Sequence, residues 1–538
     1  MYLATVPNRN SPPAILLRES YREDGKVKSR TLVNVTNWEP GVVQALRMAL
    51  KGEFATYGDP ISGVIFGVLF VLKQLADRLG ISAALGKSQE ALRVLFLVLA
   101  RIDHAGSRLS ALRWSSQHAT QDILGLSPFD ENDLYDALDW LAAKQNKVEL
   151  SLYQEHVKRT GRTPLLVLYD VTSSYFEGEQ NELAAHGYNR DKKVGKLQIV
   201  IGLLTADDGE PLAVRVFEGN TADPSTVAEQ LRVLKDQFKI EDVVMVGDRG
   251  MIKAKGKTAL EKEGWHYITA MTDAQIRTLL KKDVLQADLF DSEICEIDYD
   301  EKRLILRRND STRDREALRR KDKLSTLQEK ISARNTFVGK HPRAKAQAGL
   351  DQLMRWSKSH KLATFVTLSL GEDGTVASVI DPLAIQNNAL LDGCYCLETD
   401  LTREQMQAAT VHERYGDLQK VERNFRTMKT GLLEVRPIFL RNAERTKAHV
   451  FVAMLSLKIA RALEAMLHKT FGTIATEAGA LTIDDALVAL SRLTYLHYEE
   501  NGQTTTRLPR PDALQSSILS ALGLTFPVAA PAPTPCRQ

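Results

Sequence analysis

The feature that most limits the fold of this chain is a series of short apolar runs between residues 165 and 271. They begin at residues 165, 197, 212, 242 and 265 and read LLVLYDV, LQIVIGLL, LAVRVFEG, DVVMVGD and WHYITAM. Runs of this length, rich in Val, Ile and Leu, are typical of buried strands. A helical pattern, DPSTVAEQLRVLKDQF, lies between the third run and the fourth. Three successive strands followed by an alternation of helix and strand predict a mixed α/β sheet.

The segments before this sheet have different patterns. Residues 14–35 predict a β-hairpin, because two runs of strand-forming residues flank Asp24-Gly25, a strong two-residue turn signal. Five cations lie on the hairpin, and either contact with a nucleic-acid backbone or a solvated edge accounts for them: Arg18, Arg22, Lys26, Lys28 and Arg30. Residues 41–160 show apolar side chains three and four apart, which predicts helices.

The segments after residue 271 complete the expected organisation. Residues 302–361 hold 18 Lys and Arg against 6 Asp and Glu, a local charge of +12, whereas the remaining residues together carry −9. Such a block is typical of a surface that meets a polyanion, or of a solvated helical face. We therefore expect six segments: a hairpin (1–40), a helical region (41–160), a first part of the core (161–271), a basic insertion (272–392), a second part of the core with a helix (393–475), and a helical region with a disordered tail (476–538).

Composition and cysteine spacing indicate the cellular compartment in which this chain acts. Its 538 residues are 43% hydrophobic and 26% charged, as in soluble globular proteins. Its four cysteines show no paired metal-binding spacing and are too few for a disulfide framework. No apolar stretch reaches the roughly 20 residues of a membrane span. We expect a cytoplasmic protein, close to the nucleoid, without a membrane partner.

Three acidic residues occupy informative positions. Asp170 and Asp248 each lie at the polar end of an apolar run, and Glu422 lies on an expected helix much further along. A folded sheet can bring such carboxylates around hard divalent cations, which prefer oxygen ligands. A site of this kind suits phosphodiester chemistry with two metal ions. Taken singly, Asp170 and Asp248 are also typical of a helix cap or a tight turn.

The helix that carries Glu422 has an unusual face. Tyr415, Glu422 and Lys429 are seven residues apart, and seven residues make almost two helical turns, so the three side chains are expected on one face. Beside a nucleic-acid backbone, Glu can hold a metal, Lys can pair with a phosphate and Tyr can donate a hydrogen bond. An amphipathic surface helix with incidental charge is the alternative interpretation.

In this order and setting, the three acids resemble those of the DDE transposases of bacterial insertion sequences, whose core is a ribonuclease H-like sheet. More narrowly, the spacing Y-x2-R-x3-E-x6-K is the signature of one large group of them, and it maps to Tyr415, position 418, Glu422 and Lys429. Five further blocks resemble that group: YDVTSSYFEG, HGYNRDKKVGKLQIVIGLL, FEGNTADPST, VGDRGM and LDGCYCLETDL. The resemblance covers about residues 12–465.

The resemblance implies a fold and a catalytic site. The fold is an α/β ribonuclease H-like mixed sheet with Asp170 on its first strand and Asp248 on its fourth, preceded by a helical region and interrupted by an insertion domain. Asp170, Asp248 and Glu422 are the implied catalytic and metal-binding residues. They hold two Mg²⁺ ions, with Mn²⁺ as an alternative, and Asp170 is shared between the ions.

The resemblance also implies partners. Tyr415, Arg426, Lys429 and Arg249 are the expected DNA-binding residues, and the DNA is double-stranded, with terminal inverted repeats and a target. A homodimer on DNA is expected. The signature arginine is replaced by Leu418, so its charge would have to come from another residue: Arg414, Arg423 or Arg426.

These observations predict a cut-and-paste DNA transposase. One alternative is a metal-dependent nuclease that has the same three acids and no strand transfer. The other is an inactive, DNA-binding copy of an element, which the presence of all three acids disfavours.

Overall fold

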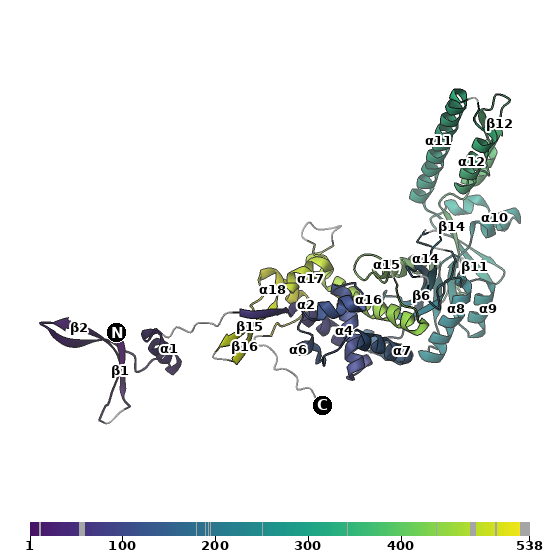
Figure 1. The fold of residues 1–538 in the computed structure, drawn as a ribbon. Coiled ribbons are helices and arrows are strands. Elements are labelled where there is room, and N and C mark those ends of the chain that lie inside the picture. Colours follow the sequence, from purple (N-terminus) through teal and green to yellow (C-terminus); the bar gives the residue numbers. More distant parts are fainter. Residues whose placement is uncertain are drawn as a thin grey trace.

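The computed structural model describes residues 1–527 except 10–11, 53–59, 179, 189, 192, 194, 250, 342, 437, 474–479 and 501–502. The C-terminal tail, which the sequence predicts to be disordered, lies beyond residue 527 and so outside the described residues. Figure 1 shows a central body, a helical arm at one end and a small sheet at the other. Among the described helices, none combines the length and apolar character that a membrane span requires.

An eight-stranded sheet forms the centre of the body, in the order β10-β11-β14-β9-β8-β5-β6-β7. Its first five strands in sequence are those expected from the apolar runs: β5 (Leu166–Tyr175), β6 (Gln198–Ala206), β7 (Pro211–Glu218), β8 (Val244–Gly247) and β9 (His266–Ala270). β6 runs antiparallel to β5 and β7, whereas β5, β8 and β9 are parallel. This is the arrangement of the ribonuclease H-like sheet that the resemblance implies.

Alternate residues of β5 pack on opposite faces of this sheet. Val167 and Tyr169 join a core with α8 (Asp223–Arg232) and α9 (Ala254–Lys262). Leu166 and Leu168 join the larger core on the other face. This alternation follows from the pleat of a strand, in which successive side chains point to opposite faces.

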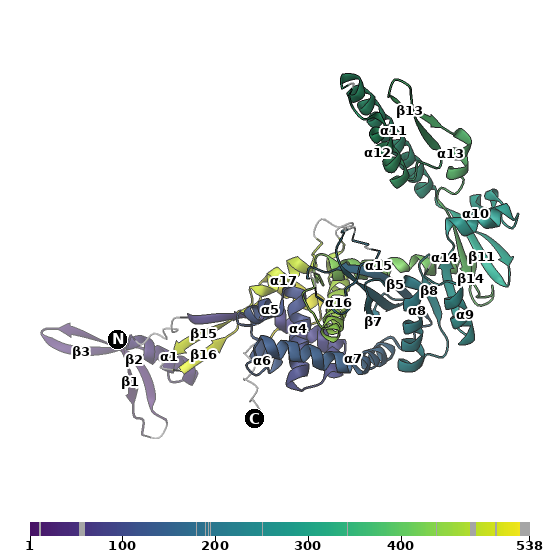
Figure 2. The same cartoon turned by 45° about the vertical axis from the view of Figure 1, so that its right-hand side comes forward.

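Helices from both ends of the chain cover the second face. α16 (Ala443–Phe471) contacts α4 (Gln89–Asp103), α7 (Glu131–Thr160) and β7. Residues 448–460 of α16 are all buried, so this helix is apolar around most of its circumference and lies inside the body (Figure 2). The helical region expected at 41–160 contains α1 (Pro40–Leu50), α2 (Gly67–Arg78), α3 (Ile81–Leu85), α5 (Arg108–Ser115) and α6 (Thr120–Leu124) as well.

The insertion begins later than the sequence pattern indicates. β10 (Cys295–Tyr299) and β11 (Lys302–Arg308) follow α10 (Asp273–Lys281) and belong to the main sheet, because β11 pairs with β14 (Cys394–Thr399). The arm in Figure 1 consists of the elements between β11 and β14: α11 (Asp310–Lys340), α12 (Ala346–Ser359), β12 (Val366–Leu370), β13 (Val376–Ile380) and α13 (Pro382–Ala389). It has an apolar core of its own, built around Leu327, Leu350 and Phe365.

The expected hairpin is present as β2 (Ala14–Glu23) and β3 (Lys26–Asn34). Asp24 and Gly25 both have positive φ, 49° and 76°, as a tight two-residue hairpin turn requires. β1 (Tyr2–Val6) adds a third strand that the sequence pattern does not reveal.

A second small sheet joins distant parts of the chain. β4 (Pro60–Ile65), in a region expected to be helical, pairs with β15 (Thr494–Glu500), which pairs with β16 (Gln503–Arg507). The C-terminal region also contains α17 (Ile483–Ser491) and α18 (Ala513–Ala521). Gly67 follows β4, and a Cβ there would lie 2.4 Å from the carbonyl oxygen of Leu490, so the close approach of α17 requires glycine.

Candidate active site

The parallel pairing of β5 and β8 places two of the three acids side by side. Tyr169 is in register with Gly247, and the next residue on each strand is Asp170 and Asp248 respectively. Asp170 continues the series of Leu166 and Leu168 on β5, so its side chain lies on the face covered by α15 (Leu418–Lys429). Glu422 is exposed on α15, which packs directly on β5. β5, the end of β8 and α15 thus bring the three acids near one another, close enough for Asp248 and Glu422 to act on the charge of Asp170.

The carboxyl group of Asp170 has an unusually high pKa. It is raised to about 7, chiefly by burial and to a smaller extent by the charges of Asp248 and Glu422, against the opposing effects of the Val171 N–H and of Arg190. The carboxylate is therefore destabilised by loss of water and by like charges. Three oxygen-only ligands with excess negative charge match the preference of hard divalent cations. The residues fit the metal that the resemblance implies.

The three carboxylates are not arranged as the ligands of one ion. Asp170, Asp248 and Glu422 do not offer three oxygen atoms within 4.8 Å of one another, although all three residues belong to the described part of the chain.

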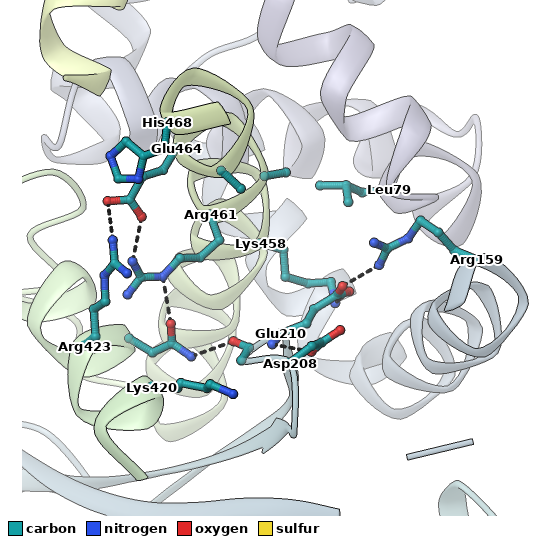
Figure 3. Close-up of a pocket in the computed structure, with 14 residues that line it drawn as sticks. Leu79, Arg159, Asp208, Glu210, Lys420, Arg423, Lys458, Arg461, Glu464 and His468 are labelled. Carbon is teal, nitrogen blue, oxygen red and sulfur yellow. Dashed lines mark hydrogen bonds and ion pairs between the residues drawn. The ribbon is translucent and has the colours of Figure 1, made fainter. Parts of the chain in front are cut away.

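Another cluster does meet that distance criterion, but it is an ion-pair network. His156, Asp208 and Glu210 lie together. The two acids of this cluster line a cavity of about 350 Å³ (Figure 3). Glu210 pairs with Lys458 and Arg159. Burial raises the pKa of Glu210, but Lys458, His156 and Arg159 outweigh it and hold the pKa well below its usual range. Two cations already neutralise the acid that a metal would need, so this cluster does not fit a divalent ion.

Residues that line the same cavity bind the helix that carries Glu422 to its neighbours. The Nδ2 of Asn424 donates to the carbonyl of Gly209 over 3.1 Å, and the Nε of Arg461 donates to the Oδ1 of Asn424 over 2.9 Å. Arg423 and Arg461 both pair with Glu464 on α16, at 2.7 and 2.8 Å (Figure 3). These contacts join α15 to the β6–β7 turn and to α16, so they hold the helix that carries Glu422 in place.

Lys429 holds the end of the same helix against β5. Its Nζ lies 2.5 Å from Asp191, 3.0 Å from the Oγ1 of Thr172 and 2.7 Å from the carbonyl of Ser173. The Lys429 side chain is only 12% exposed. Asp191, 8% exposed, also pairs with Arg436 at 2.8 Å. Lys429, the expected phosphate ligand, is thus bonded to the strand that carries Asp170. Burial lowers the pKa of Lys429, although the charge of Asp191 acts to raise it.

Sequence reasoning did not identify Asp191 or Arg190. Both lie in the HGYNRDKKVGK block, which entered the resemblance as a whole and without a role for any single residue. The backbone N–H of Arg190 donates to the Oγ of Ser173 over 2.8 Å, and its guanidinium pairs with Asp223 at 2.5 Å. Because this block lies far from Glu422 in sequence, only the fold shows that the two regions meet.

The other three expected DNA-binding residues, Tyr415, Arg249 and Arg426, differ in their contacts and exposure. Tyr415 lies on α14 (Ala408–Gly416), separated from α15 by Asp417, and its hydroxyl donates to the Oδ1 of Asp248 over 3.2 Å. Arg249 follows Asp248 and pairs with Asp273 at 2.8 Å. Arg426 is exposed on α15. Tyr415 and Arg249 therefore lie next to Asp248, one of the three acids.

Leu418 fills a core position. It is 8% exposed and joins the apolar side of α15 with Val421, Phe425 and Met428. Two of the arginines considered as replacements for the signature residue are already paired, Arg414 with Asp417 and Arg423 with Glu464. A side chain at position 418 is therefore packed among apolar residues of the body.

We expect Leu418→Arg to destabilise the protein by roughly 2–4 kcal/mol, because it buries an unpaired charge and removes apolar packing. Thermal unfolding of the parent and the variant measures this. Leu418→Met, which keeps the volume, is the control and should cost less than about 1.5 kcal/mol. An arginine variant as stable as the parent, with faster DNA cleavage, would contradict the core assignment.

Comparison with known protein families identifies the class to which this fold and site belong. The family described as "Transposase DDE domain" matches residues 161–459, more than half of the chain, and the chain belongs to this family. It is a DNA transposase, an enzyme that cuts and joins DNA. The family described as "IS1634 family transposase, N-terminal domain" matches residues 3–60, which identifies a transposase of a bacterial insertion sequence.

Other comparisons show weaker similarity. No curated protein matches the chain. The chain is similar to a structure described as the cryo-EM structure of a piggyBac transposase synaptic complex with hairpin DNA, with 8% identity and a TM-score of 0.34 over 79% of this chain and 78% of that one. For a Mos1 transposase paired-end complex with the left transposon end, the values are 14% and 0.15 over 32% and 57%. These TM-scores are too low to establish a common fold.

Proposed function

We propose that Asp170, Asp248 and Glu422 are the catalytic residues of this transposase and hold two Mg²⁺ ions, for which Mn²⁺ can substitute. The observation that carries the proposal is the approach of the three acids to one another from β5, from the end of β8 and from α15. When bound, such ions supply charge neutralisation and activation of the attacking oxygen in phosphodiester chemistry. The reaction then cuts the ends of the element and joins them to a target.

The protein's own residues position these ligands. The Tyr415 hydroxyl donates to Asp248 and fixes its orientation. The Val171 N–H donates to the Oδ1 of Asp170 over 2.7 Å, which leaves the other oxygen of this carboxylate for a cation. Arg249 and Arg426 supply positive charge for the DNA backbone. Rigid positioning of this kind is the main contribution that a protein makes to phosphoryl transfer.

We further propose a division of labour along the chain. The N-terminal sheet and the helical region up to residue 160 recognise the terminal inverted repeats, and the helical arm holds DNA through the basic block. Two copies bring a pair of ends together as a homodimer. The reaction takes place in the cytoplasm, where the nucleoid offers the element and its target.

The proposed role of the arm predicts a salt dependence. Replacing Arg319 and Lys321, both exposed on α11, by glutamine should lower the affinity for duplex DNA. Each lost phosphate contact should also reduce the slope of log K against log salt by about 0.9. Arg232→Gln, at the exposed end of α8 and outside the proposed DNA-binding regions, should leave the slope unchanged. Equal slopes for all variants would exclude the arm as a DNA surface.

An excision assay tests the proposed function. It combines the purified protein, Mg²⁺ and a plasmid that carries the gene with its flanking DNA. Double-strand breaks at the element ends, followed by joining to a second plasmid, are expected. Breaks without joining would indicate the nuclease alternative, and binding without breaks would indicate an inactive copy.

A further inference from the structure

The hairpin of the N-terminal sheet extends beyond its third strand. β1 pairs with β2 only from Ala14 to Arg18, whereas β2 and β3 remain paired as far as Glu23 and Lys26. The outer part is therefore a two-stranded ribbon, which projects from the body in both views (Figure 1, Figure 2). All its residues from 20 to 31 are exposed. A two-stranded ribbon is one of the elements that the major groove of DNA admits.

One face of the ribbon is largely neutralised by its own acids. The register places six residues on it, three from each strand: Glu19, Tyr21, Glu23, Lys26, Lys28 and Arg30. Arg30 pairs with Glu19 at 2.7 Å and Lys28 with Glu23 at 2.6 Å. The Arg30 guanidinium also lies 5.8 Å from the centre of the Tyr21 ring. We name this the paired face, because neighbouring acids pair with two of its three cations, Lys28 and Arg30.

The opposite face has a different chemistry. The register assigns to it another six residues, again three from each strand: Arg18, Ser20, Arg22, Val27, Ser29 and Thr31. We name this the arginine face. It carries two guanidinium groups, three hydroxyls and one aliphatic side chain, and no carboxylate. Among the described residues, neither Arg18 nor Arg22 forms an ion pair with an acid, in contrast to Lys28 and Arg30.

This asymmetry indicates which partner the ribbon fits. An uncovered protein surface for a second protein would be expected to be mainly apolar at its centre, but Val27 is the only apolar side chain of the arginine face, and it is 68% exposed. Arginine reads guanine, serine and threonine hydroxyls bond to base edges or phosphates, and an aliphatic group contacts the methyl of thymine. The face offers each of these and repels no phosphate.

We propose that the arginine face of the β2–β3 ribbon enters the major groove of duplex DNA and reads base sequence at the element ends. The inference rests on the proposed recognition of these ends by the N-terminal region, and it specifies the face and the groove. The paired face then points away from the DNA. Arg22, near the tip of the ribbon, is the residue expected to reach deepest.

Two variants of the full-length protein separate the faces. Arg22→Ala and Lys28→Ala each remove one cation from the ribbon, the first from the arginine face and the second from the paired face. Binding is measured to duplex fragments that tile the DNA flanking the gene, and to a scrambled duplex of equal length. Arg22→Ala should lower the preference for the bound fragment about tenfold or more, whereas Lys28→Ala should leave this ratio unchanged. Methylation of guanine N7, a major-groove atom, should interfere with binding of the parent.

Several results would overturn this proposal. An unchanged preference in Arg22→Ala would exclude the arginine face as the reader, and an equal loss in Lys28→Ala would exclude any difference between the faces. Binding that tolerates N7 methylation and yields to a minor-groove competitor would exclude the groove. If one of these results is obtained while the parent protein still excises the element, this inference fails and the proposed function stands. If the parent neither prefers a flanking fragment nor cuts, the proposed function fails with it.

Discussion

Replacing Asp170 by asparagine should reduce DNA cleavage by about 10²- to 10³-fold, the scale of loss seen when a preorganised electrostatic group is removed. Asp170 lies next to Asp248 across two parallel strands and shares its charge environment with Glu422. It is the ligand proposed to serve both ions, so its loss affects both. Asparagine keeps the shape but removes the charge that a divalent cation requires. Cleavage of the plasmid substrate, measured over time, gives the rate.

The same variant should fold and bind DNA like the parent. Asp170 is destabilised by burial and by two neighbouring acids, so asparagine should leave the apoprotein at least as stable. Mg²⁺ should raise the melting temperature of the parent, because a ligand that binds only the folded state stabilises it, and it should have little effect on the variant. Substantial cleavage by Asp170→Asn, or an equal stabilisation by Mg²⁺, would show that this residue holds no metal.

Replacing Asp191 by asparagine should reduce cleavage by about 10- to 100-fold. The carboxylate lies between Lys429 and Arg436 and joins the end of α15 to β5. Without its charge, two buried cations repel each other, and the helix that carries Glu422 can move relative to Asp170. Displacements of about 1 Å can cost this much in rate. We interpret Asp191 and Lys429 as positioning residues, an alternative to the phosphate contact that the sequence predicts for Lys429.

A double variant separates this role from DNA contact and from general loss of stability. Asp191→Asn with Lys429→Met keeps the net charge of the cluster, because one cation and one anion are removed together. Its cleavage should fall no further than that of either single variant, and all three should require more Mg²⁺ for half-maximal rate. DNA affinity and its salt dependence should stay those of the parent. If Lys429→Met alone lowered the salt slope by about 0.9, Lys429 would be a phosphate ligand.

The sequence was sufficient to predict the five core strands along the chain. Each of the five apolar runs became a strand, because a run of buried residues between turn signals is a local property. Asp24-Gly25 likewise determined the turn of the N-terminal hairpin by its backbone preference alone. The order of the strands in the sheet, and with it the parallel pairing of β5 and β8 that places Asp170 beside Asp248, comes from the structure.

Features that depend on distant partners were not predictable in this way. β10 and β11 have the pattern of an ordinary hairpin, and only their pairing with β14 assigns them to the main sheet. β4 has its partner more than 400 residues later, in β15. The seven-residue spacing of Tyr415, Glu422 and Lys429 indicated one helix, but Asp417 interrupts it. The burial of Lys429 depends on Asp191, which no local pattern connects with it.

The central claim is that Asp170, Asp248 and Glu422 hold the divalent ions, and anomalous scattering from crystals grown with Mn²⁺ tests it most directly. The account predicts anomalous peaks within about 2–2.5 Å of carboxylate oxygens of Asp170 and of at least one of the other two acids, and none at His156, Asp208 and Glu210. Peaks at the latter cluster, or no peak near Asp170 at saturating Mn²⁺, would contradict it.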